Sequence, residues 1–176
     1  MIWNIDKTFE FCYGHRVHSQ VLDKPEYSIN TMCKCRHLHG HQGTVKLGLQ
    51  GTKLENGMVT DFHNLNWLKQ WIDSVLDHKF IIDRSDPLIK TLIPGFTDSP
   101  FNPDTTFQVV DAKELDVDDV MRELYESYVI VDFVPTSENL AKWIFDMASE
   151  KMAEIGIRVS FVDFWETPKS HVRYEG

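Results

Sequence analysis

The first half of the chain alternates between apolar and polar residues in two stretches, and each alternation predicts a half-buried strand. His15 continues the apolar parity of residues 2–11, which is set by Trp3, Ile5, Phe9 and Phe11. Residues 44–51 alternate again, through Val45, Leu47 and Leu49. Residues 17–36 are polar and show no sustained period, so they predict a loop between the two strands.

Two later stretches repeat apolar residues at helical spacing and carry helix-end signals. Asp61 can cap a helix that runs to about Asp77. A second helix begins near residues 135–138 and runs toward Ile155, and Gly156 stands where a C-terminal cap is expected. Residues 157–166 predict a final strand, and one more strand is expected at 58–60 or 128–133. The coarse order is strand, strand, helix, insertion, helix, strand.

The chain has the length of one domain, with 176 residues and room for one core. Residues at about 83–130 are rich in Pro, Asp, Thr and Phe and predict an insertion that leaves this core. From Asp83 to Asp132 there are twelve acidic residues against four basic ones, in a chain whose net charge is -9. We therefore expect a single domain over 1–176 that carries an acidic insertion.

Composition and charge limit the kinds of partner and the cellular location that we expect for this protein. The acidic balance argues against a nucleic acid partner, because binding phosphates requires clustered Lys and Arg. No apolar run reaches the length that spans a bilayer, and the N-terminal residues lack the apolar core of a signal peptide. The odd set of Cys12, Cys33 and Cys35 has poor spacing for disulfides and favours reduced thiols. We expect a soluble, cytoplasmic protein that binds neither nucleic acid nor membranes.

The segment KCRHLHGH predicts a metal site beside a thiol. On an extended strand, His39 and His41 point their rings to one face, where two imidazoles can chelate a metal. Zinc at a catalytic site commonly takes three protein ligands and leaves one position for water or substrate. His15 is a candidate third ligand, because it closes a strand that can pair beside the other two. The alternatives are His18, His37 and His63.

Three further positions carry candidate chemistry. Cys33 and Cys35 both lie near imidazoles that promote a reactive thiolate, although either thiol also suits a structural role. Asp77 precedes His78 at a helix end, where a carboxylate can orient an imidazole, and a solvated helix end is the alternative. Glu166 ends a largely apolar strand, where its carboxylate needs either ligand N–H donors or a salt bridge.

Taken together, these segments resemble the 6-pyruvoyltetrahydropterin synthase superfamily, and most closely its bacterial branch of 6-carboxytetrahydropterin synthases in queuosine precursor biosynthesis. Six segments match in family order: Phe9–Phe11 with His15, Cys35–His41 as C-x3-HGH, Val59–Phe62 as VxDF, Leu76–His78, Pro135–Asn139 and Glu166–Thr167. Cys33 has the C-x5-HGH spacing of the pyruvoyl branch. We favour Cys35 as the catalytic cysteine, because KCRHLHGH matches the motif of the carboxy branch almost residue for residue.

The resemblance implies a role for each candidate residue. Zn2+ would be bound by His15, His39 and His41, and the catalytic group would be Cys35, Asp77 and His78. Glu166 would anchor the pterin ring. Thr136 and Glu138 would help to line the pocket, although both also suit capping at a helix N-terminus.

The resemblance also implies a fold and an assembly. The family fold is the T-fold, an α+β fold with an antiparallel four-stranded sheet and two helices on one face. Trimers of this fold close into a barrel and usually pair as a hexamer, with active sites between subunits. Asp77 and His78 would then serve the Cys35 of a neighbouring subunit.

The implied activity is zinc-dependent conversion of 7,8-dihydroneopterin triphosphate to 6-carboxy-5,6,7,8-tetrahydropterin, with release of acetaldehyde and triphosphate. The first alternative is a pyruvoyl-type triphosphate lyase, which would release no acetaldehyde. The second is a non-catalytic protein that binds zinc and pterin without consuming the triphosphate. The large insertion suggests this hypothesis. The acidity of that insertion argues against its binding the triphosphate.

Overall fold

The computed structural model describes residues 1–29, 33–94, 107–109 and 116–176. Within them the strands are hydrogen-bonded in the order β4-β5-β3-β1-β2-β6-β7. The chain divides into two compact units. Unit 1 consists of Met1–Cys12, His41–Asp77 and Thr136–Gly176, and unit 2 consists of Tyr13–Gly40 and His78–Pro135. The strands β1 (Trp3–His15) and β2 (His39–Gly51) contribute residues to both units.

The strands of unit 1 follow from the alternation in the sequence. Along β1 the exposed and inward-facing residues alternate, and Phe9 and Phe11 are buried. Strand β2 pairs antiparallel with β6 (Arg158–Thr167), and Val45 lies opposite Phe164. Strand β7 (Ser170–Tyr174) then pairs antiparallel with β6 as a hairpin. Because β1 and β2 bury mainly one parity of their residues, the sheet of unit 1 has one covered face.

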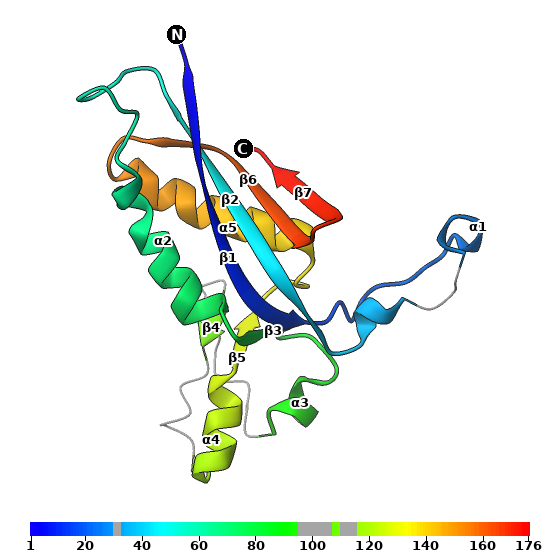
Figure 1. Ribbon diagram of the computed structural model, residues 1–176. Helices are drawn as coiled ribbons and strands as arrows, with labels where there is room; N and C mark the ends of the chain where they lie inside the picture. The colour runs from blue at the N-terminus through cyan, green and yellow to red at the C-terminus, as the bar shows by residue number, and fades with distance from the viewer. Residues whose placement is uncertain (30–32, 95–106, 110–115) are drawn as a thin grey trace. The chain divides into compact units, whose positions relative to one another are not determined.

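Two helical segments cover that face (Figure 1). The first runs without interruption through three elements, namely η2 (Phe62–Leu65), α2 (Asn66–Trp71) and the π-helical η3 (Ile72–Leu76). The second is α5 (Ser137–Ala153). The two segments contact each other through Trp71 and Trp143, whose ring centroids lie 5.0 Å apart edge to face. After α5, Gly156 takes a left-handed conformation with φ 71°, as the sequence predicted for a helix end.

Asp61 begins the first helical segment. Its carboxylate accepts a hydrogen bond from the backbone N–H of His63 at 2.8 Å, which is the capping role predicted from the sequence. This backbone hydrogen bond, together with the bond to the His63 ring, lowers the pKa of Asp61 below its ordinary value. Asp61 of the VxDF segment is therefore a helix cap.

Unit 2 contains strands that the sequence largely concealed. The end of β1 pairs in parallel with β3 (Lys79–Asp83), and His15 lies opposite Ile81. Strand β3 pairs in parallel with β5 (Tyr128–Val131), which pairs antiparallel with β4 (Phe107–Val109). The helical elements of unit 2 are α1 (Pro25–Ser28), η1 (Lys34–Arg36), α3 (Ile89–Leu92) and α4 (Asp119–Glu126).

The α+β class expected from the sequence is confirmed, and the sheet is larger and mixed where four antiparallel strands were expected. The added strands β3, β4 and β5 include two parallel pairs. Strand β3 ends where the acidic insertion at 83–130 begins, β4 lies within the insertion, and β5 begins near its end. Residues 95–106 and 110–115 of the insertion lie outside the described part. The alternative strand expected at 128–133 corresponds to β5, whereas residues 58–60 form no strand.

In the described residues, no helix is both long and apolar enough to cross a membrane. The longest of these helices, α5, carries a charged face with Lys142 paired to Asp146 and Lys151 paired to Glu154. Its apolar face packs on β6 and β7, where Phe145 meets Tyr174 at 5.1 Å between ring centroids.

Candidate active site

His15 is fully buried at the end of β1, and a backbone carbonyl fixes its ring. Its Nδ1 lies 2.7 Å from the carbonyl oxygen of Pro135. A carbonyl can only accept, so Nδ1 carries the proton and donates it. In the neutral ring, Nε2 is then left with its lone pair, which is the form that binds a metal.

His39 is fixed in the same way at the start of β2. Its Nδ1 lies 2.8 Å from the carbonyl oxygen of His37, so this ring also presents the Nε2 lone pair. The two Nε2 atoms lie 3.1 Å apart. Two neutral imidazoles cannot both donate along that line, and two lone pairs at this distance repel unless a cation or a proton lies between them. The pair is therefore arranged to share a positive charge.

His41 completes a group of three imidazoles. One ring nitrogen from each of His15, His39 and His41 can be chosen so that all three lie within 4.8 Å of one another. His39 and His41 reach the same face because both lie on the extended strand β2, as their spacing predicted. Three nitrogen ligands are a donor set that suits zinc, and the cluster can hold a metal ion of this kind.

The alternative third ligands lie elsewhere. His18 pairs with Asp83 at 2.9 Å from its Nε2. His63 is 85% exposed in its side chain and pairs with Asp61. The side chain of His37 is exposed, and this residue serves the site through its backbone carbonyl. The structure thus brings His15 to the HxH pair, as the resemblance implied.

Glu166 lies beside His41 within unit 1. Its Oε1 is 3.6 Å from His41 Nε2, and its side chain is 23% exposed. Strand β6 aims it there through pairing with β2, in which Thr44 lies opposite Trp165. A half-buried carboxylate at this place can accept N–H donors from a ligand.

The hairpin that carries Glu166 is fixed by a charge cluster around Asp163. Arg173 donates two hydrogen bonds to the Asp163 carboxylate, at 2.7 and 2.8 Å, and His171 Nε2 lies 3.0 Å away. Burial by itself raises the pKa of Asp163, but the bonds from Arg173 and His171 outweigh it and hold the pKa below the ordinary value. Strands β6 and β7 are therefore joined by a bidentate ion pair.

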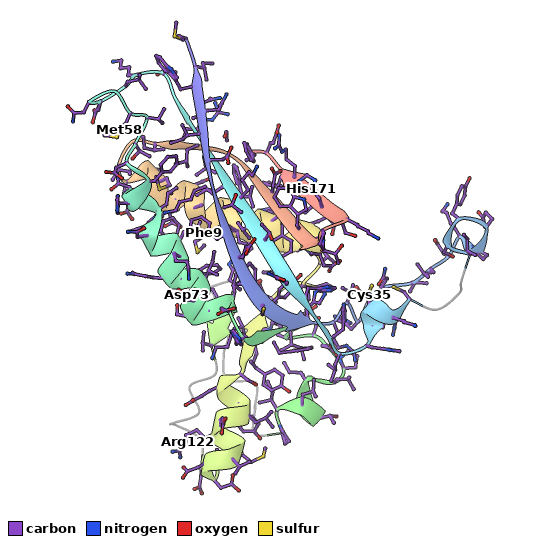
Figure 2. All side chains as sticks on the ribbon, viewed as in Figure 1. Phe9, Cys35, Met58, Asp73, Arg122 and His171 are labelled. Carbon is purple, nitrogen blue, oxygen red and sulfur yellow. The ribbon has the colours of Figure 1, made fainter. Side chains whose placement is uncertain are left out.

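Cys35 and Cys33 differ in their surroundings. Figure 2 shows Cys35 in the short helix η1, where its side chain is half-buried. The Cys33 thiol caps that helix by accepting from the Cys35 backbone N–H at 3.4 Å, and it donates to Gln20 Oε1 at 2.9 Å. Two structural contacts thus engage the Cys33 sulfur.

Asp77 and His78 lie where the first helical segment ends. In unit 1, Asp77 Oδ1 accepts a hydrogen bond from the backbone N–H of Cys12 at 2.9 Å. In unit 2, the exposed His78 has a left-handed backbone with φ 57°, a conformation that is uncommon for a residue other than glycine. Strained backbone of this kind often occurs at functional sites, where surrounding structure holds it in place.

Thr136 and Glu138 lie at the N-terminus of α5. Thr136 is the N-cap, and its hydroxyl accepts from the Asn139 backbone N–H at 3.3 Å. Glu138 is exposed in the first turn, where a carboxylate interacts well with the helix dipole. The structure therefore gives Thr136 the capping role that the sequence left open beside a binding role.

Sequence reasoning missed the backbone groups that orient the ligands. Neither the Pro135 nor the His37 carbonyl oxygen has a signal of its own in the sequence, because any residue offers one. Reasoning from the sequence also left Asp83 without a role, although this residue binds His18. The sequence indicated only that the insertion is acidic overall, and it did not single out Asp83.

The fold and the cluster define an α+β protein with a three-histidine site on its first two long strands. The family model for 6-pyruvoyl tetrahydropterin synthase matches residues 4–176. The chain belongs to this family of enzymes, and the T-fold resemblance noted in its sequence is thereby confirmed.

Three relatives and solved structures show how far the likeness extends. The 6-carboxy-5,6,7,8-tetrahydropterin synthase of Aquifex aeolicus is 33% identical over 99% of both chains. The crystal structure of an uncharacterized protein from Wolinella succinogenes is 47% identical, with a TM-score of 0.93 over 100% of this chain and 99% of that one. The 6-pyruvoyl tetrahydropterin synthase of Caenorhabditis elegans is 23% identical, with a TM-score of 0.58 over 100% of this chain and 96% of that one, and shows the fold alone.

Proposed function

We propose that this protein is a lyase that converts 7,8-dihydroneopterin triphosphate and water to 6-carboxy-5,6,7,8-tetrahydropterin, acetaldehyde and triphosphate, as a step toward 7-deazaguanine nucleosides such as queuosine. The observation that carries the proposal is the relative from Aquifex aeolicus, which bears the name of this synthase and matches over the full length of both chains. The C-x3-HGH spacing of Cys35 agrees with that branch of the family.

We infer that the metal is zinc and that His15, His39 and His41 hold it. Their nitrogen donor set and the 3.1 Å approach of two Nε2 atoms support this assignment. Bound there, zinc supplies Lewis acidity that makes the side-chain hydroxyls of the substrate more acidic.

The remaining candidate residues bind the ring or move protons. Glu166 accepts two N–H donors from the 2-amino-4-oxo edge of the pterin, a pairing that selects this ring. Cys35, as the thiolate, exchanges protons with the substrate, and His78, oriented by Asp77, serves a second proton transfer. Thr136 and Glu138 border the pterin at the start of α5.

We also propose the assembly and setting that the family implies. The chain is one T-fold domain over residues 1–176, and trimers form a barrel that pairs as a hexamer in the cytoplasm. Residues Asp77 and His78 then serve the Cys35 of a neighbouring subunit. Native mass spectrometry at several concentrations measures this assembly, and a monomer at all of them contradicts it.

One experiment tests the reaction directly. The purified, zinc-loaded protein is incubated with 7,8-dihydroneopterin triphosphate, and the products are identified by mass. Equal amounts of 6-carboxy-5,6,7,8-tetrahydropterin and acetaldehyde are expected. The Cys35→Ala variant, with the same zinc content, is the matched control and should form both products about 100-fold or more slowly.

The second candidate function is the pyruvoyl-type lyase on the same substrate. It is supported by the description of the matching family model and by the C-x5-HGH spacing of Cys33. This candidate predicts triphosphate release without acetaldehyde. Binding of zinc and pterin with no consumption of substrate would instead indicate a non-catalytic protein.

A further inference from the structure

Three consecutive residues after His15 each make a contact to a distant part of unit 2. Arg16 Nε lies 2.8 Å from Asp86 Oδ2. The backbone N–H of Val17 donates to the carbonyl oxygen of Cys35 at 2.8 Å. His18 Nε2 lies 2.9 Å from Asp83 Oδ2. The segment 16–18 is therefore held at two points by carboxylates of one turn. It in turn holds the cysteine loop, which we define as residues 33–37 around η1.

Both carboxylates belong to the start of the acidic insertion and both are buried. The Asp86 side chain is 0% exposed and that of its partner Arg16 is 11% exposed. The Asp83 side chain is 5% exposed and that of His18 is 16% exposed. Burying a carboxylate is costly unless it is paired and hydrogen-bonded, so neither contact is an incidental surface ion pair.

The second oxygen of each carboxylate is held by the turn that follows β3. Asp83 Oδ1 accepts from the Ser85 backbone N–H at 2.9 Å, and Asp86 Oδ1 accepts from that of Leu88 at 2.8 Å. The Asp86 backbone N–H donates to the Asp83 carbonyl at 2.9 Å. Hydrogen bonds within the turn thus fix both carboxylates independently of their contacts with Arg16 and His18. The turn after β3 is therefore a rigid support for these two contacts.

The topology explains why these groups meet. Strands β1 and β3 run parallel, and His15 lies opposite Ile81. Parallel strands end at the same edge of a sheet, so the residues after His15 emerge beside Asp83. The first residues of the insertion therefore lie next to the segment that links the buried His15 to the cysteine loop.

We propose that Asp83 and Asp86 are positioning residues for Cys35: through His18 and Arg16 they fix segment 16–18, and Val17 then holds the cysteine loop by its hydrogen bond to Cys35. The kinetic part of this proposal rests on the proposed function, whereas the effect on thiol accessibility does not. The insertion thereby serves the site through its first turn.

The decisive variant is Asp86→Asn, which keeps an oxygen for the Leu88 N–H and removes the charge that pairs with Arg16. We expect kcat to fall at least about tenfold, with KM changed by less than about threefold, because a misplaced proton-transfer group slows the chemical step more than binding. The matched control is Asp119→Asn, which removes a 99% exposed partner of Arg122 from the same insertion and should leave both constants unchanged.

Thiol alkylation tests the same inference without turnover. Iodoacetamide labelling, followed by peptide mass mapping, should label Cys35 at least about threefold faster in Asp86→Asn, because its half-buried loop opens. The exposed Cys12 is an internal reference whose rate should not change. If the wild-type protein consumes no substrate but this labelling shift occurs, the proposed function fails and the positioning role stands.

Two results would overturn the positioning role. One is a folded Asp86→Asn protein with unchanged kcat and an unchanged Cys35 labelling rate. The other is a loss of zinc in parallel with activity, which would indicate a general structural role. Should Asp86→Asn fail to fold, the Arg16→Lys variant replaces it, because it retains the charge. Arg16→Lys should keep part of the wild-type kcat and part of the protection of Cys35 from alkylation. The proposal is contradicted if Arg16→Lys and Asp83→Asn both keep the full wild-type values.

Discussion

The Nε2 atoms of His15 and His39 lie 3.1 Å apart, and each ring uses its Nδ1 to donate to a backbone carbonyl. This arrangement commits both Nε2 lone pairs to the same small volume. It is the geometry that a metal ion between the two rings would stabilise.

The first prediction concerns metal binding. Replacing a ligand, as in His39→Ala, should weaken zinc binding on the order of 100-fold or more, because the remaining imidazoles cannot complete the donor set. His37→Ala is the matched control, since it leaves the backbone carbonyl that orients His39. Metal analysis after dialysis against a competing chelator measures the difference. Equal zinc retention by His39→Ala and the wild type would remove these residues from the metal site.

The second prediction separates the two cysteines. Cys35→Ala should lower turnover about 100-fold or more, because it removes the group that exchanges protons with the substrate. Cys33→Ala should retain most turnover and lose some stability, since the Cys33 sulfur caps η1 and contacts Gln20. Steady-state kinetics and thermal unfolding of both variants provide the comparison. The reverse pattern would assign the chemistry to Cys33.

The third prediction concerns acid stability at the β6–β7 hairpin. Asp163 has a pKa below its ordinary value of 3.8 in the folded protein, despite a burial that opposes this, because Arg173 and His171 bond to it. A lowered folded-state pKa contributes stability above the unfolded pKa, and this contribution is lost as the pH falls through the folded-state pKa. Near neutral pH, Asp163→Asn should therefore lower the free energy of unfolding by about 2 kcal/mol.

The pH dependence is the control for this prediction. The stability difference between Asp163→Asn and the wild type should shrink as the pH falls below 3.8, where the wild-type carboxylate also becomes neutral. Urea unfolding at a series of pH values measures it. A difference that stays constant down to strongly acidic pH would show that packing, and not charge, is what the substitution disturbs.

The fourth prediction tests the role of Thr136. Thr136→Ala should cost about 1 kcal/mol of stability, because the Asn139 backbone N–H loses its acceptor. Thr136→Ser keeps a hydroxyl and should restore most of that loss. If Thr136 also borders the pterin, KM should rise in the Ala variant and recover in the Ser variant. A KM that stays at the wild-type value in both variants would leave Thr136 with the cap alone.

The sequence predicted unit 1 far better than unit 2, and the reason is burial. Strands β1 and β2 are covered on one face, so their alternation is visible. Strand β5 is buried at all four residues, so its sequence is a continuous apolar run. Such a run has no period that distinguishes a strand from a helix. Strand β3 begins directly after η3 without a Gly or Pro signal and was missed.

The same contrast applies to the candidate site. The spacing of His39 and His41 indicated a chelate, because period-two geometry is a local property of a strand. The pairing of Arg16 with Asp86 joins residues far apart in the sequence and had no local signal. Charged residues are usually exposed, so nothing in the sequence distinguished this buried pair from the many acidic residues around it.

The parallel register in which His15 lies opposite Ile81 determines whether a folded chain presents His15 as a metal ligand. A one-residue slip of β1 would turn His15 to the opposite side of the sheet and would expose the apolar side chains of that strand. Such a misfolded chain could retain much of its secondary structure and still lack a ligand. The fraction of chains that bind a metal would then report how much of a refolded sample has the correct strand alignment.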